Sequence, residues 1–344
     1  MCENDYGNLK IAVVGAGAIG GICAAFIKDA GFDVQVVVRN LEHAGQIRDK
    51  GITISGIKGR MTVKMDAVAG VENMSEDRDI ILLCVKAVSM TEAAQQLKSR
   101  IRPEAVVVSL QNGFCEEKLA SILGRKNITG CVTGWGATMH SRLELEMTSS
   151  GDFIIGNIDN EQDLRLKGVQ AVLSSIVPVK ISTNIAGDLF AKLIINSCIT
   201  SVGAVCGLCL GPMLLKRKIR IIFLKIMEEA MQVADALDIK VSVFAGKLDY
   251  YEFLESKGLI SDLKRHVFLM ALGFKYRKLK SSALQSLERA KPTEIDFLTG
   301  FITENAEKYG IDVPVNAAVY RIVKDIEQGG LDICVDNIDR IIVS

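Results

Sequence analysis

The sequence of 344 residues predicts an α/β domain with a parallel sheet, followed by an all-α domain. The length suits two domains of roughly 100–200 residues each. In the first half, short apolar runs rich in β-branched residues alternate with helical stretches, which is the pattern of βαβ units. After Glu161 the apolar residues recur at helical spacing to about Glu327, apart from a short strand near Val177–Ile181. We therefore divide the chain into domains at residues 1–183 and 184–344.

The composition excludes several classes of protein. Hydrophobic residues make up 49% of the chain and charged residues 24%, which is typical of a globular and not of a disordered protein. The 41 basic residues balance the 41 acidic ones, so no net charge attracts nucleic acid or an anionic membrane. The N-terminus lacks the basic and apolar regions of a secretory signal. We expect a cytoplasmic protein whose partners include neither nucleic acid nor a membrane.

The nine cysteines lie at irregular spacing, mostly within apolar runs, as expected for buried free thiols in a reducing compartment. Cys206 and Cys209 form the one C-x-x-C pair. No second pair and no histidine lies near them in the sequence, which gives only weak support to redox or metal chemistry. The three histidines are scattered, and we predict no metal site.

One uncharged run, residues 193–215, is long enough to cross a bilayer. It also contains Asn196, Ser197, three glycines and Pro212, and Lys192 stands at its edge. This mixture favours a buried helix or helix pair in a large water-soluble domain over a membrane span.

The first βαβ unit is the clearest in the chain. Lys10–Gly15 predicts a strand that ends in a glycine turn, and Ala18–Ala30 predicts a helix that stops at Gly31. Asp33–Val38 then predicts a second buried strand. Further strands are expected at 79–85, 105–110, 128–133 and in the pieces up to 155, with a helix at 89–99, a hairpin within 52–65, and the longest helices at 186–208, 213–237 and 292–309.

The turn of this unit reads Gly15-Ala16-Gly17-Ala18-Ile19-Gly20, the pattern G-x-G-x-x-G. Between a buried strand and a helix, the first glycine permits a tight turn and the second lets the backbone approach a pyrophosphate. The third allows close packing of helix on strand, and the phosphates lie on the helix N-terminus. We therefore predict a Rossmann-type dinucleotide-binding domain. A purely structural glycine turn is the alternative.

The end of the second strand bears on the choice of cofactor. NAD sites usually have Asp or Glu there, whereas NADP sites need a cation for the 2′-phosphate. Here the strand ends in Arg39-Asn40, and no carboxylate occurs until Glu42. An arginine makes a forked contact to phosphate, so we predict NADP(H). The alternative is a solvated arginine at a strand end.

The second half contains two groups of polar residues of interest. Lys192, Asn196 and Thr200 stand at i, i+4 and i+8, which on a helix places an ammonium, an amide and a hydroxyl on one face. A lysine that snorkels beside two structural polar residues is the alternative. Lys291–Asp296 reads K-P-T-E-I-D, and its proline and acidic residues favour the first turn of a helix, a capping role.

Together these residues resemble the ketopantoate reductase family, the 2-dehydropantoate 2-reductases, from about Lys10 to Glu327. Five landmarks of the family recur in order: Gly15–Gly20, Val85-Lys86-Ala87, Gln111-Asn112-Gly113, the K-x-x-x-N pair Lys192 and Asn196, and Ser281-Ser282 followed by Thr293-Glu294-Ile295-Asp296. Each motif alone is weak, but five in the right order are specific.

The resemblance implies a role for several residues. Lys192 is implied as the general acid, and Glu294 as a group that binds substrate and organises the site. Asn196 and Ser282 are implied as substrate contacts. Thr200 stands where the family commonly has a second asparagine, and we include it among the substrate contacts.

By the same resemblance, Lys86 and Asn112 lie at the junction of cofactor and substrate. The sequence departs from the family at 283–286, which reads Ala-Leu-Gln-Ser, and it carries extra residues around 241–275. These departures concern the pantoate side of the pocket and leave the residues implied in reduction unchanged.

We therefore expect NADPH-dependent reduction of 2-dehydropantoate to pantoate, for coenzyme A synthesis, with hydride going to the C2 carbonyl and Lys192 donating the proton. One alternative is a reductase of a different branched 2-oxo acid. Another is a non-catalytic protein that senses NADP(H); such a sensor needs neither Lys192 nor Glu294, yet both are present. The sequence leaves a homodimer open.

Overall fold

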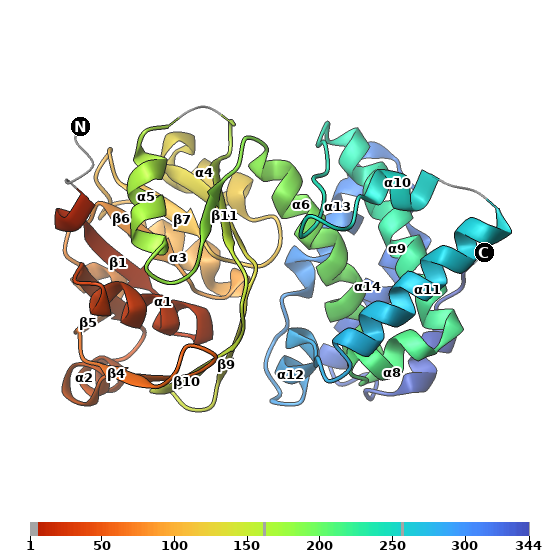
Figure 1. Ribbon diagram of the computed structural model, residues 1–344, viewed down its shortest axis with the longest axis horizontal. Helices are drawn as coiled ribbons and strands as arrows, with labels where there is room; N and C mark the ends of the chain where they lie inside the picture. Colours follow the sequence, from red (N-terminus) through yellow and green to blue (C-terminus); the bar gives the residue numbers. More distant parts are fainter. Residues whose placement is uncertain (1–5, 161–162, 256–257, 344) are drawn as a thin grey trace. The chain divides into compact units, whose positions relative to one another are not determined.

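The computed structural model describes residues 6–160, 163–255 and 258–343. The chain forms two compact units (Figure 1). The α/β unit comprises Met1–Gln111 and Cys115–Ile185, and the helical unit comprises Asn112–Phe114 and Ala186–Ser344. The expected order of an α/β part followed by an all-α part is confirmed. The short segment Asn112–Phe114 is the one place where the grouping departs from sequence order.

The α/β unit is built on an eight-stranded sheet in the order β12-β11-β8-β7-β6-β1-β2-β5. All neighbours in it run parallel except β11 and β8, which are antiparallel. The strand order reverses between β1 and β6, which creates the crevice where open α/β sheets bind ligands. The strands are β1 (Lys10–Val14), β2 (Asp33–Val38), β5 (Asp66–Ala69), β6 (Ile80–Leu83), β7 (Val106–Ser109), β8 (Ile128–Thr133), β11 (Phe153–Asn157) and β12 (Val179–Ile181).

The strands β6 and β7 are buried along their whole length, as are the last four residues of β1. Such near-continuous apolar runs are what a parallel sheet covered on both faces requires. The helices and 3-10 turns of this unit are α1 (Ala18–Asp29), α2 (Leu41–Lys50), α3 (Met90–Leu97), α4 (Glu116–Leu123), α5 (Arg165–Leu173), η1 (Tyr6–Asn8), η2 (Val71–Asn73), η3 (Ala87–Ser89) and η4 (Arg125–Asn127).

A second, four-stranded sheet of order β4-β3-β10-β9 packs on α1. Its strands are β3 (Ile52–Gly56), β4 (Met61–Val63), β9 (Gly136–Met139) and β10 (Glu144–Ser149). The antiparallel pairing of β3 with β4 confirms the hairpin expected within 52–65.

The helical unit contains the remaining elements, which are α6 (Ile185–Asn196), the π-helical η5 (Ser197–Ser201), α7 (Val202–Cys206), α8 (Leu210–Leu215), α9 (Arg217–Ala236), α10 (Tyr250–Glu255), α11 (Leu259–Lys275), α12 (Ser282–Leu287), η6 (Ile295–Phe297), α13 (Thr299–Tyr309), α14 (Pro314–Glu327) and η7 (Val335–Arg340). Its core is apolar and is centred on α6, η5, α7 and α9. The α6–η5–α7 rod is the one described helix long and apolar enough to cross a membrane, and 83% of its most apolar window is buried inside the protein. The expected buried helices at 193–215 are therefore confirmed.

Two of the expected long helices are wrong in their extent. The helix expected at 213–237 is broken at Lys216, whose backbone is extended. The buried guanidinium of Arg220 stabilises this break, because its Nη1 donates to the last carbonyls of α8, at 2.7 Å to Leu214 O and 2.9 Å to Leu215 O. The helix expected at 292–309 begins only at Thr299, because Thr293 and Asp296 are held by contacts to α14.

A buried carboxylate fixes the start of α14. Glu229 of α9 accepts from the backbone N–H groups of Val315 (2.9 Å) and Asn316 (2.8 Å) and from the Asn316 amide (2.7 Å). Burial raises the pKa of the Glu229 carboxyl, and these donors oppose the rise. A carboxylate at a helix N-terminus also suits the helix dipole.

Replacing Glu229 by alanine is expected to lower the free energy of unfolding by about 2–4 kcal/mol, because it leaves buried donors without an acceptor. Thermal unfolding measures the effect as a fall of several degrees in Tm. Glu228→Ala is the matched control, since Glu228 is 38% exposed and pairs only with Lys225 on the surface. Equal melting temperatures for the two variants would contradict this role of Glu229.

Candidate active site

The glycine turn after β1 has the geometry that its pattern predicts. Gly15 has φ +103°, and a Cβ there would stand 2.9 Å from the backbone nitrogen of Val85. A Cβ on Gly20 would meet Gly15 O and would stand 2.7 Å from Cys84 Cβ. The first and third glycines are therefore required for the turn itself and for the close approach of α1 to the end of β6.

Gly17 differs, because a Cβ there would meet no described atom within 4 Å. The fold therefore does not require glycine at this position, and the open space is what the close approach of a ligand needs. Gly17 is also the N-cap of α1, where no described side chain caps the helix and the first turn has no acidic residue. Exposed N–H groups at a helix start suit an anion, so this cradle fits the pyrophosphate of a dinucleotide.

The two glycines give a direct test of the cradle. Gly17→Ala is expected to keep the Tm of the wild type and to weaken dinucleotide binding at least tenfold, or about 1.4 kcal/mol, because the methyl group fills the ligand's space. Gly20→Ala is the contrasting variant and is expected to lower Tm. Calorimetric titration and thermal unfolding measure the two effects. Unchanged affinity in Gly17→Ala would show that the ligand does not approach this backbone.

Arg39 directly follows β2 and is exposed at the carboxyl end of the sheet. Its guanidinium donates to the Ser89 hydroxyl at the end of η3. The next residue, Asn40, caps α2 by accepting from the His43 N–H at 2.8 Å. The Arg39 guanidinium is therefore a cation at the end of the strand next to β1 and its glycine turn. Its hydrogen-bond partner, the Ser89 hydroxyl, is neutral.

Two polar residues follow the neighbouring strands. Lys86 is exposed at the start of η3, after β6. Gln111 follows β7 and is buried, and its amide donates to Leu83 O (2.9 Å) and Val85 O (3.2 Å). Gln111 thus links the end of β7 to the end of β6 by hydrogen bonds. The next residue, Asn112, is the first that belongs to the helical unit.

Three phenylalanines place Asn112 beside segments of the helical unit that are distant in sequence. The Phe114 ring lies 5.1 Å from the Phe301 ring of α13 and 6.1 Å from the Phe190 ring of α6. Gly113 has φ +103°, and a Cβ there would stand 2.9 Å from Phe297 Cβ. The aromatic contacts therefore bring together the segments that carry Asn112, Lys192 and Glu294.

The helix α6 carries the predicted proton donor. Lys192 and Asn196 stand one turn apart on α6, and both are half-buried. The wider π-helical turn of η5 follows at once and contains Thr200. Insertions of this kind recur at functional sites.

Thr200 lies in this π-helical turn, where the hydrogen bonds run i→i+5 and a turn takes slightly more than four residues. A spacing of four residues therefore still returns close to the same face, and the placement of Thr200 on the face of Lys192 and Asn196 stays a prediction. Thr200 is 7% exposed, and the hydroxyl of its neighbour Ser201 lies 2.6 Å from the Thr299 hydroxyl of α13.

The segment Thr293-Glu294-Ile295-Asp296 does not begin a helix, so the expected capping role is wrong. Thr293 is buried, and both its N–H (2.7 Å) and its hydroxyl (2.5 Å) donate to Glu327 Oε1 of α14. Asp296 accepts from the Tyr320 hydroxyl at 2.7 Å and pairs with Lys324 at 3.1 Å. Burial lowers the pKa of Lys324, but its bonds to Glu327 and Asp296 outweigh this and leave the pKa above its usual value.

These contacts hold the first and last residues of the segment against α14. The segment leads into the 3-10 turn η6 instead of an α-helix. Glu294 lies between these two residues, half-buried. The structure therefore gives Thr293 and Asp296 a scaffolding role and holds Glu294 at a fixed place.

The serine pair also divides into two roles. Ser281 is buried and caps α12 by accepting from the Leu284 N–H at 3.2 Å. A Cβ on Gly203 of α7 would stand 2.8 Å from the Ser281 hydroxyl, so the pair lies close against α7. Ser282 is exposed at the first position of α12.

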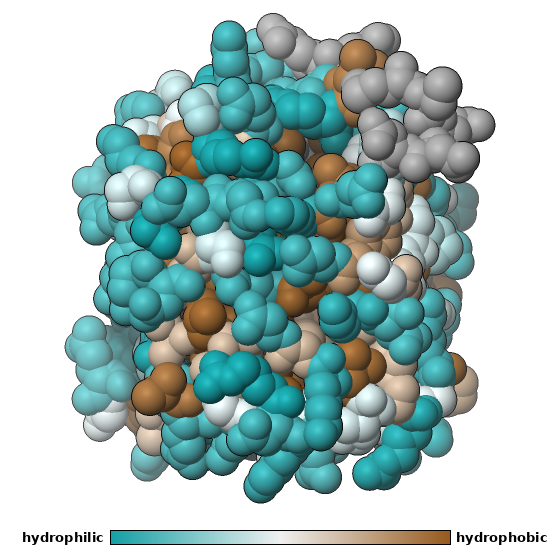
Figure 2. All heavy atoms as spheres, turned by 90° about the vertical axis from the view of Figure 1, so that its left-hand side faces the viewer, coloured by the Kyte–Doolittle hydropathy of each residue, from teal (hydrophilic) through white to brown (hydrophobic). Residues whose placement is uncertain are grey.

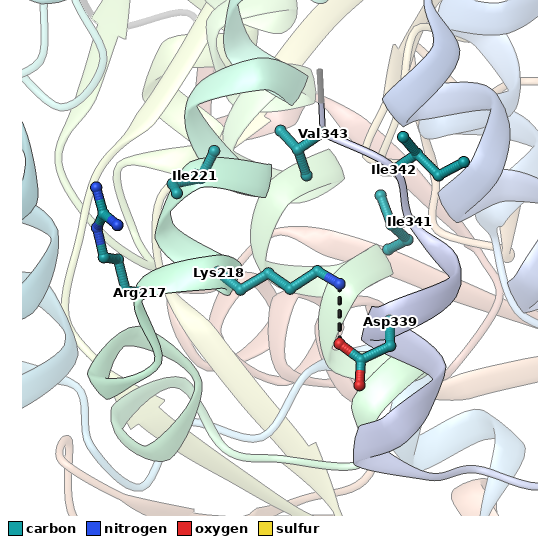
Figure 3. A pocket seen from close by; sticks show the side chains of 7 residues that line it. All are labelled: Arg217, Lys218, Ile221, Asp339, Ile341, Ile342 and Val343. Carbon is teal, nitrogen blue, oxygen red and sulfur yellow. Dashed lines mark hydrogen bonds and ion pairs between the residues drawn. The ribbon is translucent and has the colours of Figure 1, made fainter.

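Two surface recesses lie away from the predicted site residues. One recess of about 480 Å³ lies where the start of α9 faces the C-terminal segment, and Lys218 pairs there with Asp339 at 2.8 Å (Figure 3). None of the predicted site residues lines it. Within the described chain no three His, Cys, Asp or Glu side chains are placed to hold a metal ion. Burial raises the pKa of Cys206 to about 11, which does not favour a reactive thiolate.

A parallel sheet with a glycine cradle at its switch point, followed by a helical unit that gathers polar residues, defines a dinucleotide-dependent oxidoreductase. The family profile described as "Ketopantoate reductase PanE/ApbA" matches residues 11–160, and that of its C-terminal part matches residues 184–327. The chain belongs to the ketopantoate reductase family.

Individual relatives agree with this assignment. A 2-dehydropantoate 2-reductase of Archaeoglobus fulgidus is 27% identical over 321 residues, which cover 93% of this chain and 98% of the relative. A crystal structure of a PanE/ApbA family ketopantoate reductase from Ralstonia eutropha superposes with a TM-score of 0.80 at 25% identity, covering 93% of this chain and 99% of that one. A ternary structure of D-mandelate dehydrogenase with NADH and anilino(oxo)acetate has the same fold, with a TM-score of 0.79 at 21% identity and coverage of 93% and 99%.

Proposed function

We propose that this protein reduces 2-dehydropantoate to pantoate with NADPH, as a cytoplasmic enzyme of pantothenate and coenzyme A synthesis. One observation carries the proposal: the aromatic contacts of Phe114 gather the segments of Asn112, Lys192 and Glu294 in one unit. The open cradle at Gly17 supplies the complementary dinucleotide site in the other unit. Relatives named 2-dehydropantoate 2-reductase over 93% of the chain support this choice of substrate.

In the proposed reaction, different residues of this chain bind the substrate, stabilise the developing charge and donate the proton. The cofactor, when bound, supplies a hydride for the C2 carbonyl carbon of the 2-oxo acid. Negative charge then grows on the carbonyl oxygen, where the Lys192 ammonium stabilises it and transfers a proton from Nζ. Glu294 accepts hydrogen bonds from substrate hydroxyls, and Asn196 and Ser282 orient the substrate. Lys86 and Asn112 would contact the cofactor when it is bound.

Arg39 determines the choice between the two nicotinamide cofactors in this proposal. Its guanidinium follows β2 and is exposed, and it would make a forked contact to the 2′-phosphate of a bound cofactor. We expect NADPH to bind at least tenfold more tightly than NADH, and Arg39→Glu to erase or invert that preference. Titration of both cofactors into both proteins measures this. Arg48→Glu, at another exposed arginine of the α/β unit, is the control and should leave the ratio unchanged. Equal affinity of the wild type for both cofactors would rule out this role of Arg39.

A second candidate substrate is a different branched 2-oxo acid. Thr200 favours it, because a short hydroxyl side chain stands where the family commonly has the longer amide of asparagine. A panel of 2-oxo acids, assayed by loss of NADPH absorbance, decides between the two. The highest kcat/KM for 2-dehydropantoate supports the main proposal, and a higher value for another acid supports the second. Tight NADPH binding without turnover of any acid would indicate a sensor.

A further inference from the structure

A carboxylate stands at an unfavourable place at the end of α14. Glu327 is the last residue of this helix, and its side chain is only 12% exposed. Charged side chains normally lie at the surface, as on the mainly hydrophilic face of the α/β unit in Figure 2. A helix C-terminus also carries a partial negative charge, so a carboxylate there lowers the stability of the helix. Residues that break a local rule in this way are expected at functional or strained sites.

The two oxygens of the Glu327 carboxylate have different partners. Oε2 pairs with Lys324 Nζ at 3.0 Å, and this ion pair offsets the cost of the charge. Oε1 accepts from both the N–H (2.7 Å) and the hydroxyl (2.5 Å) of Thr293. Thr293 is 1% exposed, so these two hydrogen bonds are shielded from water. Oε1 is therefore the atom through which α14 holds the residue directly before Glu294.

The Thr293 hydroxyl makes a second hydrogen bond, which spans Glu294. The Ile295 N–H donates to Thr293 Oγ1 at 3.2 Å. The hydroxyl has one proton, and because Glu327 accepts that proton, the lone pairs remain for Ile295. Thr293 and Ile295 are both buried, so the backbone of Glu294 is held on both sides. Glu327 thus sets the direction of the hydroxyl, and the hydroxyl sets the backbone at Glu294.

We propose that Glu327 is a positioning residue of the active site, which acts through Thr293 to hold the Glu294 carboxylate where it binds the substrate hydroxyls. This inference rests on the proposed function, in which Glu294 binds substrate. The oxygens of Glu327 are bonded to Thr293 and Lys324, so Glu327 itself does not contact the substrate. Hydrogen bonds weaken steeply with poor angles, so a displaced Glu294 carboxylate binds substrate less tightly. The role of Glu327 is therefore to keep KM low.

Variants of Glu327 separate this role from a purely structural one. Glu327→Ala is expected to raise KM for 2-dehydropantoate about 5- to 20-fold and to change kcat less than about twofold. Its Tm should also fall, because the buried donors of Thr293 lose their acceptor. Glu327→Gln keeps an oxygen for Thr293 but loses the ion pair with Lys324, so its KM should return to near the wild-type value while its Tm stays lower. Asp296→Ala, which frees the far end of the same segment from α14, is the matched control and should lower Tm without raising KM.

The Thr293 hydroxyl can be tested without a change at Glu327. Thr293→Val removes the hydroxyl and keeps the backbone N–H bond, and we expect it to raise KM about 3- to 10-fold. Thr293→Ser keeps the hydroxyl and should have the KM of the wild type. This pair decides the proposal even if Glu327→Ala does not fold. Equal KM values for Thr293→Val and Thr293→Ser would overturn it.

A double-mutant cycle shows whether Glu327 acts through Glu294. In the Glu294→Ala background, Glu327→Ala should raise KM by less than about twofold, because no carboxylate is left to position. Titration of pantoate in the presence of NADPH measures the same contact without turnover, since two reduced compounds do not react, and its dissociation constants should follow KM.

The outcomes distinguish this inference from the proposed function. If Glu294→Ala raises KM but Glu327→Ala does not, or if the two effects multiply in the double variant, the inference is overturned and the proposed function stands. If Glu294→Ala leaves KM unchanged, or the wild type turns over no 2-oxo acid, the proposed function is overturned and this inference with it.

Discussion

Lys192→Ala is expected to lower kcat by about 10²–10⁴, the usual scale for a positioned proton donor. Its interaction with the substrate oxygen strengthens as charge develops, so the loss falls on turnover more than on KM. Affinity for NADPH should hardly change, because the phosphate site that we propose, Gly15–Gly20, belongs to the other unit. Steady-state kinetics with the preferred 2-oxo acid, together with a cofactor titration, measure both effects.

Two further variants separate chemistry from structure at this position. Lys192→Arg keeps a cation but donates a proton poorly, so kcat should stay far below that of the wild type. Addition of a small primary amine should restore part of the turnover of Lys192→Ala, which a purely structural lysine would not allow. Near-normal kcat in Lys192→Ala would exclude this residue as the acid.

Glu294→Ala is expected to raise KM roughly 10- to 100-fold and to change kcat less. A carboxylate that accepts substrate hydroxyls does so in both the ground state and the transition state, so its loss appears mainly in binding. Hydrogen bonds to a charged group contribute about 1.5–3 kcal/mol, which corresponds to this range.

The same segment provides a matched control for Glu294. Asp296 stands two residues later and is held by Tyr320 and Lys324, so Asp296→Ala should lower Tm and leave KM near the wild-type value. If Asp296→Ala raises KM as much as Glu294→Ala does, the segment acts only as a scaffold, and Glu294 has no special contact with substrate.

Much of the α/β unit could be predicted because its determinants are local. The apolar run, the glycine turn and the helix that stops before Gly31 occur within one stretch of chain, and α1 ends at Asp29, one residue short of the expected Ala30. The cradle at Gly17 follows from the same pattern. Buried strands and tight turns are specified by neighbouring residues, so sequence alone is sufficient for them.

The site in the helical unit was less predictable because its contacts are distant in sequence. Thr293 is bound by Glu327, 34 residues later, and this long-range contact overrides the local preference of Pro292 and its neighbours for a helix start. The π-helical turn after Asn196 has no residue pattern of its own. The one available indication for Phe114 was an aromatic residue directly after the Gln111-Asn112-Gly113 motif.

The tripeptide Asn112–Phe114 also determines how the protein can be divided. The chain passes between the two units at three places, after residues 111, 114 and 185. A fragment that starts at residue 186 therefore lacks the Phe114 ring, and the space between Phe190 and Phe301 is left open to water. Residues 186–344 alone therefore do not contain the complete core of the helical unit. Any chimera that attaches it to a different nucleotide-binding partner has to include these three residues in the loop after the fifth parallel strand of that partner's sheet, or its core stays incomplete.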